Sequence, residues 1–237
     1  MERIVAAYLD DLSFDNSTVT AEIGAGAGAV TRRIATRSTG FVKAFEPSKG
    51  FVAEALSRVT GFDNLMFEAA DGAALPLADA SVDHVIMHTV LTHVPDPMPI
   101  LKEAYRVLKP SGTVVVCDAD FSKSTLASFA NDPLDICARV FVSDFVTHPH
   151  IVGQLRPLLG EAGFSVEAFR FDNRPILDNL QMLPWVVETC KLMVARGQIT
   201  QVLADTMAAE YTARAENGSL FGFQVFATAI ARKAADS

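Results

Sequence analysis

The sequence predicts an α/β protein in which parallel strands alternate with helices that cover both faces of the sheet. Strand-like and helix-like segments alternate through residues 1–120 of the 237-residue chain. A glycine-rich turn separates the first strand from the first helix, and acidic residues stand where successive strands end. Strands joined through helices run parallel with right-handed crossovers. Ligands of such open sheets bind at the carboxyl edge, where these polar residues are expected to meet.

The first strand, at 18–23, is followed by a glycine-rich turn and a helical pattern at 29–37. Glycines at alternate positions let the backbone pass close to a ligand, and a helix start presents free N–H groups. The turn is therefore predicted to hold an anionic or zwitterionic group. Such turns also bind dinucleotides or simply reverse the chain, so the spacing alone does not identify the ligand. The turn consists of Gly24, Ala25, Gly26, Ala27 and Gly28.

The next elements continue the alternation. Strands are predicted at 40–46, 65–70, 82–88 and 113–118, and helices at 48–59 and 97–108. A proline opens the last of these helices, and the turn residues 109–112 close it.

After residue 118 the pattern changes. The segment 119–150 is predicted to form short helices or a loop over the carboxyl edge of the sheet. A helix at 154–162, a strand at 165–171, a mostly helical stretch at 177–210 and a last strand at 221–231 follow. We expect a single domain over 1–237 with cap insertions at about 119–150 and 174–217.

Charge and hydropathy exclude several classes of partner. The chain has 20 Lys and Arg against 28 Asp and Glu, a net charge of −8, and no basic run that would neutralise phosphates, so no nucleic-acid partner is expected. Charged residues interrupt any signal-peptide core in the first twenty positions, and no apolar run reaches the roughly 20 residues that span a bilayer. A soluble, cytoplasmic protein without membrane insertion is expected.

No metal site is predicted. Cys117, Cys137 and Cys190 are odd in number and lack C-x-x-C spacing, so they are expected to be reduced packing residues. His84 and His88 have the spacing of zinc ligands on a helix, but they fall on a predicted strand. Four residues of a strand span roughly 13 Å, which one ion does not bridge.

Acidic groups at the ends of three neighbouring strands are the strongest functional signal. Glu22 ends the first strand, Glu46 ends the second, and Asp71 with Gly72 follows the third. A carboxylate about 20 residues beyond a glycine turn can accept hydrogen bonds from two ribose hydroxyls. An acid beside Gly72 can accept from an exocyclic amine while the neighbouring N–H binds a ring nitrogen. Each acid alone is equally a helix cap or a solvated loop residue, but together they describe a nucleoside pocket.

Five segments in order resemble the class I S-adenosylmethionine-dependent methyltransferases, specifically the small-molecule, type 11 group similar to ubiquinone and menaquinone biosynthesis enzymes. The segments are EIGAGAG, AFEPS, AADGAALPLADASVDHV, HTVLTHVPDP and LKEAYRVLKPSG. They cover roughly residues 18–120, with weaker likeness at 154–170 and 221–231. The resemblance implies a Rossmann-like, doubly wound sheet of seven strands with an antiparallel last strand, plus a helical cap. It also implies S-adenosylmethionine as the cofactor and a small-molecule acceptor.

The resemblance further implies a role for each site residue. Glu22 would order the glycine loop and the ammonium group of the cofactor, and Glu46, followed by Pro47, would hold the ribose hydroxyls. Asp71 with Gly72 would meet the adenine edge, and His88 would point toward the methionine end. The backbone that passes the methionine part of the cofactor would be that of Gly24, Ala25, Gly26 and Gly28.

Dinucleotide binding is the main alternative, because a nicotinamide enzyme also places its ribose acid where Glu46 stands. Here, however, the third glycine follows the second by two residues and not three, and Asp71 with Gly72 has no evident task in a dinucleotide site. The methyltransferase interpretation is therefore favoured.

Methyl transfer from a sulfonium requires the protein mainly to align the acceptor and exclude water. A base helps when the acceptor is a phenol, enol or hydroxyl, and the candidates are His88, His93 and His148. For two of them the structural interpretation is favoured: His93 is expected to buttress the turn that follows it, and His148 to be an exposed loop residue.

The predicted cap is rich in apolar side chains, which favours an aromatic or polyketide-like acceptor, O-methylation and a place in secondary metabolism. Apolar residues at helical spacing also fit core packing or a dimer contact. These residues are Phe121, Phe129, Phe141, Phe145, Met182, Leu183, Trp185, Met193 and Phe223.

Two further alternatives stay open. Only residues 1–17 precede the first strand, whereas many relatives place further helices there, so closure must come from elsewhere in the chain or from a partner subunit in a homodimer. Proteins of this fold also include some that bind the cofactor yet catalyse a non-methylating rearrangement or serve as ligand-binding modules.

Overall fold

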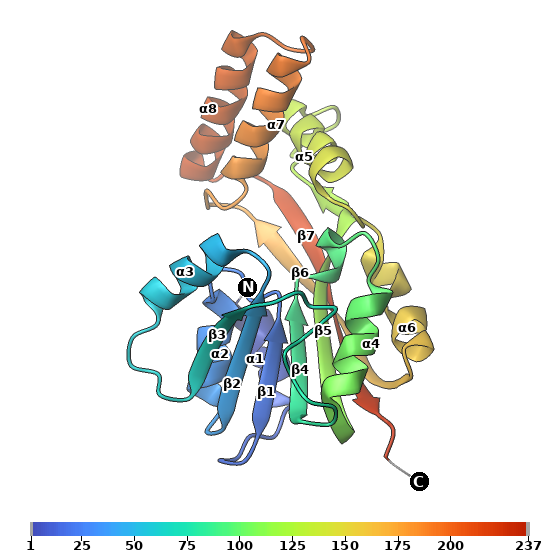
Figure 1. The fold of residues 1–237 in the computed structure, drawn as a ribbon. Coiled ribbons are helices and arrows are strands. Elements are labelled where there is room, and N and C mark those ends of the chain that lie inside the picture. Colours follow the sequence, from blue (N-terminus) through green and yellow to red (C-terminus); the bar gives the residue numbers. More distant parts are fainter. Residues whose placement is uncertain (1, 236–237) are drawn as a thin grey trace. The chain divides into compact units, whose positions relative to one another are not determined.

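The computed structural model describes residues 2–235, which contain a seven-stranded sheet with the order β3-β2-β1-β4-β5-β7-β6 (Figure 1). Strands β1 to β5 are parallel where they pair, and β7 runs against them (Figure 1). The predicted α/β class with an antiparallel last strand is confirmed. The strands are β1 (Val19–Ile23), β2 (Phe41–Glu46), β3 (Leu65–Ala69), β4 (Val82–His88), β5 (Leu108–Thr125), β6 (Phe164–Ile176) and β7 (Gly222–Lys233).

The helices connect these strands in the expected alternation. They are α1 (Glu2–Asp10), α2 (Ala29–Arg37), α3 (Lys49–Arg58), the short 3-10 turn η1 (Leu91–His93), α4 (Met98–Val107), α5 (Pro133–Phe145), α6 (Ile151–Glu161), α7 (Leu183–Ala195) and α8 (Gln201–Asn217). Within residues 2–235, none of the helices has the length and apolar character that crossing a membrane requires.

The chain divides into two compact units. Among the described residues, the first comprises 2–118, 151–171 and 227–235, and the second comprises 119–150 and 172–226. The expectation of one domain with cap insertions stays a prediction. Each unit is described below by itself.

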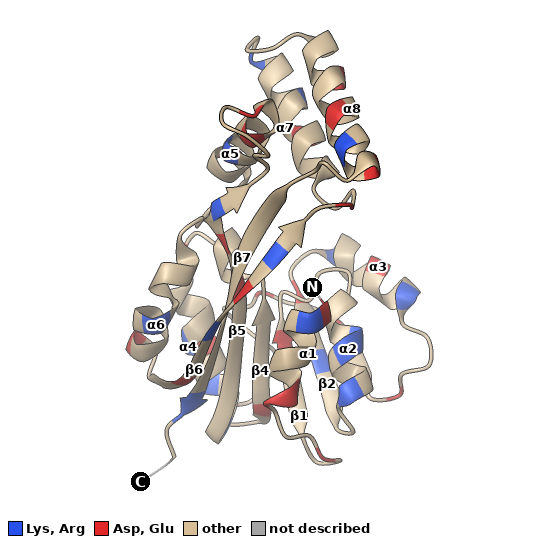
Figure 2. Ribbon diagram, turned by 180° about the vertical axis from the view of Figure 1, so that it is seen from behind, with Lys and Arg blue, Asp and Glu red and all other residues tan. Residues whose placement is uncertain are grey.

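The core of the first unit lies on both faces of the sheet. Helices α1 and α2 cover one face, and α4 and α6 cover the other (Figures 1 and 2). Because the central parallel strands are covered on both sides, they read as continuous apolar runs. Val114, Val115 and Val116 of β5 are all fully buried.

Helix α1 is an element that the sequence patterns did not predict. Its buried side chains are Ile4, Val5, Tyr8 and Leu9, so one face packs on the sheet unit while the other carries charge. Helices α1 and α2 are neighbours, and acidic residues of α1 face basic residues of α2 (Figure 2). Glu2 pairs with Arg33, and Asp10 pairs with Arg37 at 3.2 Å. A nine-residue helix is marginal alone, and packing stabilises it.

Strand β5 begins earlier than predicted. The segment 109–112 was expected to be a turn before a strand at 113–118. In the structure β5 already pairs Leu108 with Val82, and the register then shifts so that Thr113 pairs with His84. The turn residues therefore form an irregularity within the strand, with Ser111 at φ 62°. A bulge absorbs extra residues in this way without ending a strand.

In the second unit, the helices and strands differ from those predicted. Residues 119–150 hold the end of β5 and the single helix α5, and the stretch predicted as helical at 177–210 forms two helices separated around Gly197 (φ 69°). Its core includes Met182 and Met193, with Leu183 and Trp185 packed against it. For these four residues the packing interpretation is right.

Aromatic rings of the second unit also stack on one another. Trp185 lies 4.1 Å from Phe141 between ring centroids, and 5.5 Å from Phe121. Phe129 and Phe145 keep about half of their surface exposed, at 56% and 43%. Cys117, Cys137 and Cys190 are all buried, as expected of packing residues.

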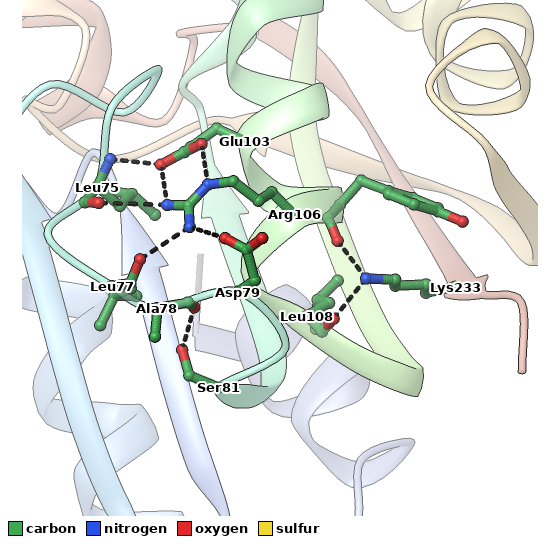
Figure 3. Close-up of polar contacts among 10 residues, drawn as sticks. Leu75, Leu77, Ala78, Asp79, Ser81, Glu103, Arg106, Leu108 and Lys233 are labelled. Carbon is green, nitrogen blue, oxygen red and sulfur yellow. Dashed lines mark hydrogen bonds and ion pairs between the residues drawn. The ribbon is translucent and has the colours of Figure 1, made fainter. Parts of the chain in front are cut away.

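Arg106 of α4 holds the loop between β3 and β4 in place (Figure 3). Its guanidinium donates to both carboxylate oxygens of Glu103, at 2.8 and 2.6 Å. It also donates to the carbonyls of Leu77 and Leu75, and to Asp79 at 2.6 Å. Glu103 in turn accepts from the backbone N–H of Leu75 at 2.6 Å. The planar, multi-donor head of arginine suits this arrangement, and a lysine would not replace it.

We expect Arg106→Met to lower the free energy of unfolding by about 1–3 kcal/mol, because it leaves the buried Glu103 without its charged partner. Urea denaturation measures the loss, and hydrogen exchange of residues 75–81 should accelerate. The matched control is Arg156→Met, on the exposed face of α6. Equal stability of the two variants would contradict a structural role for Arg106.

Candidate ligand-binding site

A cavity of about 410 Å³ opens in the first unit beside the carboxyl ends of β1, β2 and β4. Its size falls within the range of small-molecule sites. Seven of the residues proposed from sequence line it, together with six others. The lining consists of Ile23, Gly24, Gly26, Glu46, Pro47, Phe51, Asp71, Gly72, Thr89, Val90, His93, Val94 and Ile100.

The glycine turn between β1 and α2 has a backbone that side chains would disturb. Gly24, Gly26 and Gly28 have φ angles of 71°, 52° and 76°, in the left-handed region. A Cβ on Gly24 would lie 2.6 Å from Val90, and one on Gly28 would lie 2.7 Å from the ring of Phe67. At Gly26, by contrast, nothing lies within 4 Å. Close packing therefore explains why Gly24 and Gly28 lack a side chain. Gly26 has open space beside it and lines the cavity.

Glu46 joins this turn to the end of β2. One carboxylate oxygen accepts from the N–H of Gly26 at 3.0 Å, and the other accepts from the N–H of Ser48 at 3.0 Å. The side chain is 8% exposed. A carboxylate oxygen can accept more than one hydrogen bond. Glu46 is therefore a fixed, buried acid that retains acceptor capacity beside the cavity.

Asp71 and Gly72 form a turn after β3. The Asp71 carboxylate accepts from the N–H of Ala73 at 2.9 Å, and the residue is exposed. A Cβ at position 72 would lie 2.6 Å from Ile23 of β1. Gly72 is thus required where the turn packs against the first strand, which brings its backbone to the cavity wall.

Six lining residues were not singled out from the sequence. Phe51 is 49% exposed although it lies in the first turn of α3. An aromatic residue off the buried face of a helix is a signal that sequence inspection could have used. Thr89 has a positive φ of 58°, which no composition pattern indicates. The others, Ile23, Val90, Val94 and Ile100, give the cavity an apolar wall.

Glu22 of β1 directly precedes the lining residue Ile23 in the sequence. It is 1% exposed, and its Oε2 has no hydrogen-bond partner within the described residues. Burial raises the pKa of its carboxyl to about 8. The residue is therefore mostly neutral at pH 7, and a cation nearby would favour its charged form. Like Glu22, the turn residues Ala25 and Gly28 are not among the residues that line the cavity.

The three candidate histidines occupy different places. His93 lines the cavity, and desolvation lowers its pKa below the ordinary value. His88, at the end of β4, is not a lining residue, and burial lowers its pKa to about 4. Its Nδ1 lies 3.3 Å from the hydroxyl of Tyr8. His148 belongs to the second unit. Of the three candidates, His93 is the one among the residues that line the cavity.

His84 shares β4 with His88, as the rejection of a shared metal ion assumed. Its Nε2 lies 2.9 Å from the carbonyl oxygen of Ser13, at the opposite end of the strand from the cavity.

Comparisons with known proteins agree on one kind of domain. A family model described as a methyltransferase domain matches residues 21–116. A demethylmenaquinone methyltransferase from Tropheryma whipplei is 34% identical over 158 residues, which cover 64% of this chain and 65% of that protein. The chain spans between about two fifths and two thirds of the length of the curated relatives it matches, for example 39% and 65% of two demethylmenaquinone methyltransferases.

Solved structures share the fold at low identity. The YcgJ protein from Bacillus subtilis aligns with a TM-score of 0.70 at 18% identity and covers 100% of both chains. The cyclase SpnF aligns with a TM-score of 0.63 at 19% identity, over 99% of this chain and 81% of that chain.

The buried carboxyl of Glu22 predicts a pH-dependent stability. Its pKa of about 8 lies above the ordinary value of 4.5 for a glutamate carboxyl, so the folded protein binds the extra proton between these values. This group therefore lowers the free energy of unfolding as pH rises from about 4.5 to 8, by at most about 1.4 kcal/mol per pH unit.

Glu22→Gln should lose less stability than the unsubstituted protein between pH 5 and pH 8. Denaturation curves at both values measure this, with the exposed Glu161→Gln as the control. Parallel pH profiles for Glu22→Gln and the unsubstituted protein would show that the carboxyl is not perturbed.

Proposed function

The chain belongs to the class I S-adenosylmethionine-dependent methyltransferases, and from this premise we propose that it methylates a small, largely apolar acceptor. The observation that carries the proposal is the carboxylate of Glu46. It is buried, is held by Gly26 and Ser48, and lines a cavity that it shares with the glycine turn and Gly72. An acid, open backbone and apolar side chains thus surround one volume, which supports the proposal.

The residues present fit S-adenosylmethionine. Glu46 offers acceptor oxygens for ribose hydroxyls, and the open face of Gly26 leaves room for a ligand against the backbone. The exposed ring of Phe51 lies on the same cavity and can stack on a purine. The unpartnered oxygen of Glu22, beside the turn, complements a cationic ligand. A nicotinamide dinucleotide would leave the turn at Asp71 and Gly72 without a task.

When bound, the cofactor supplies a methyl group that is already activated on a positively charged sulfur. The chain must then position the acceptor and keep water away. Four apolar side chains, Ile23, Val90, Val94 and Ile100, line the cavity and exclude water from its wall. This lining supports an apolar acceptor.

O-methylation is the favoured reaction. His93 lines the cavity, and desolvation lowers the pKa of its imidazole, which favours the neutral form that acts as a base toward a hydroxyl. His93 is therefore our candidate for the base. His148 stays a candidate from sequence alone.

We expect Glu46→Gln to weaken binding of S-adenosylhomocysteine by about 1–3 kcal/mol, because the ribose hydroxyls lose a charged acceptor. Isothermal titration calorimetry measures the affinity. Glu68→Gln on the neighbouring strand β3 is the matched control and should bind as the unsubstituted protein does. If the two variants bind equally well, Glu46 does not contact the ligand.

Turnover distinguishes methyl transfer from the alternative activity. Incubation with isotope-labelled S-adenosylmethionine and a panel of phenols, quinols and polyketide-like hydroxyl compounds should yield S-adenosylhomocysteine and labelled ether in equal amounts. His93→Gln should lower kcat without weakening cofactor binding to the same degree. Conversion of an acceptor while the cofactor stays intact would instead identify a non-methylating rearrangement.

A further inference from the structure

Helix α1 delivers one buried polar group to the end of β4. Tyr8 is 0% exposed, and its hydroxyl lies 3.3 Å from Nδ1 of His88. The two rings are tilted by 45°, with centroids 6.0 Å apart. Within residues 2–235, His88 Nδ1 is the hydrogen-bond partner of that hydroxyl. A helix absent from the sequence-based prediction therefore contacts a residue next to Thr89 and Val90 of the cavity wall.

The position of Tyr8 is firmly set. Ile4, Val5 and Leu9 of the same helix are buried with it, and three arginines pair with acids on and after α1. These pairs are Arg33 with Glu2, Arg37 with Asp10, and Arg170 with Asp11. A side chain held by packing on one face and ion pairs on the other has little freedom to turn away from His88.

Either Tyr8 or His88 could donate the hydrogen bond between them, and the two possibilities differ in which polar group is left unpaired. The environment of Tyr8 raises the pKa of its phenol above the ordinary value, chiefly through burial, so the hydroxyl keeps its proton. If it donates to Nδ1, both groups are satisfied. If Nδ1–H donated to the phenol oxygen, the phenolic hydrogen would be buried without an acceptor. An unpaired buried donor disfavours that arrangement by roughly tenfold or more.

We propose that Tyr8 is a positioning residue that donates its hydroxyl hydrogen to Nδ1 of His88 and thereby holds the imidazole as the Nε2–H tautomer. His88 then presents an N–H donor at Nε2 and not a lone pair. It acts as a hydrogen-bond donor at the end of β4, and the role of base falls to another group. The importance of this tautomer for methyl transfer rests on the proposed function, but the tautomer itself does not.

Nitrogen-15 NMR of histidine-labelled protein at pH 7.5 tests the proposal directly, because protonated and unprotonated ring nitrogens have widely separated shifts. His88→Gln assigns the resonance. We expect Nδ1 of His88 to be unprotonated and Nε2 to be protonated. In Tyr8→Phe, which keeps the ring, the population of the Nδ1–H form should rise severalfold from below about a tenth. The matched control, Tyr105→Phe, removes a hydroxyl elsewhere in the first unit and should leave His88 unchanged.

Two results would overturn the proposal: an Nδ1–H tautomer in the unsubstituted protein, or an identical tautomer in Tyr8→Phe. The first is independent of whether the variant folds. Calorimetry with S-adenosylhomocysteine on the same samples separates this test from that of the function. Failure of binding with the expected tautomer would reject the cofactor assignment and leave the positioning role of Tyr8 intact.

Discussion

The carboxylate of Glu46 links the two parts of the chain that define the cavity. Its two oxygens accept from Gly26, in the turn after β1, and from Ser48, at the start of α3. The turn is also fixed to β2, because the N–H groups of Gly24 and Ala25 both donate to the carbonyl of Phe45. An acid in this position therefore orders the backbone that forms the cavity before any ligand arrives. Preorganisation of this kind reduces what binding must order.

Two buried ionisable groups, Glu22 and His88, directly precede the lining residues Ile23 and Thr89 in the sequence. Glu22 is an acid whose pKa is raised by burial, and His88 is a base whose pKa is lowered by burial. Both shifts favour the neutral forms, so the site keeps little fixed charge of its own apart from Glu46 and Asp71. A cationic ligand would find one carboxyl that can ionise in response, whereas an anionic ligand would find no fixed positive side chain among the lining residues. This asymmetry favours a positively charged cofactor.

The sequence predicted the parts of the fold in which local pattern and tertiary structure agree. Alternating apolar strands, the glycine turn and the acids at strand ends are all local features, and they placed Glu46, Gly26 and Gly72 on one cavity. Helix α1 was missed because nine residues with weak helix signals are stabilised by packing and by Arg33 and Arg37, which lie far along the chain. The bulge at 109–112 was missed because its residues are those of an ordinary turn. The places of Phe51 and the strained Thr89 at the cavity depend on their tertiary surroundings, which a local sequence pattern does not predict.

We propose that Glu46 is the ribose acid of an S-adenosylmethionine site. A crystal structure of the protein with S-adenosylhomocysteine tests it most directly. We expect the ligand in the cavity of the first unit, with both ribose hydroxyls within hydrogen-bond distance of the Glu46 carboxylate and the adenine edge at Asp71 and Gly72. A ligand bound elsewhere, or a ribose that does not contact Glu46, would contradict it.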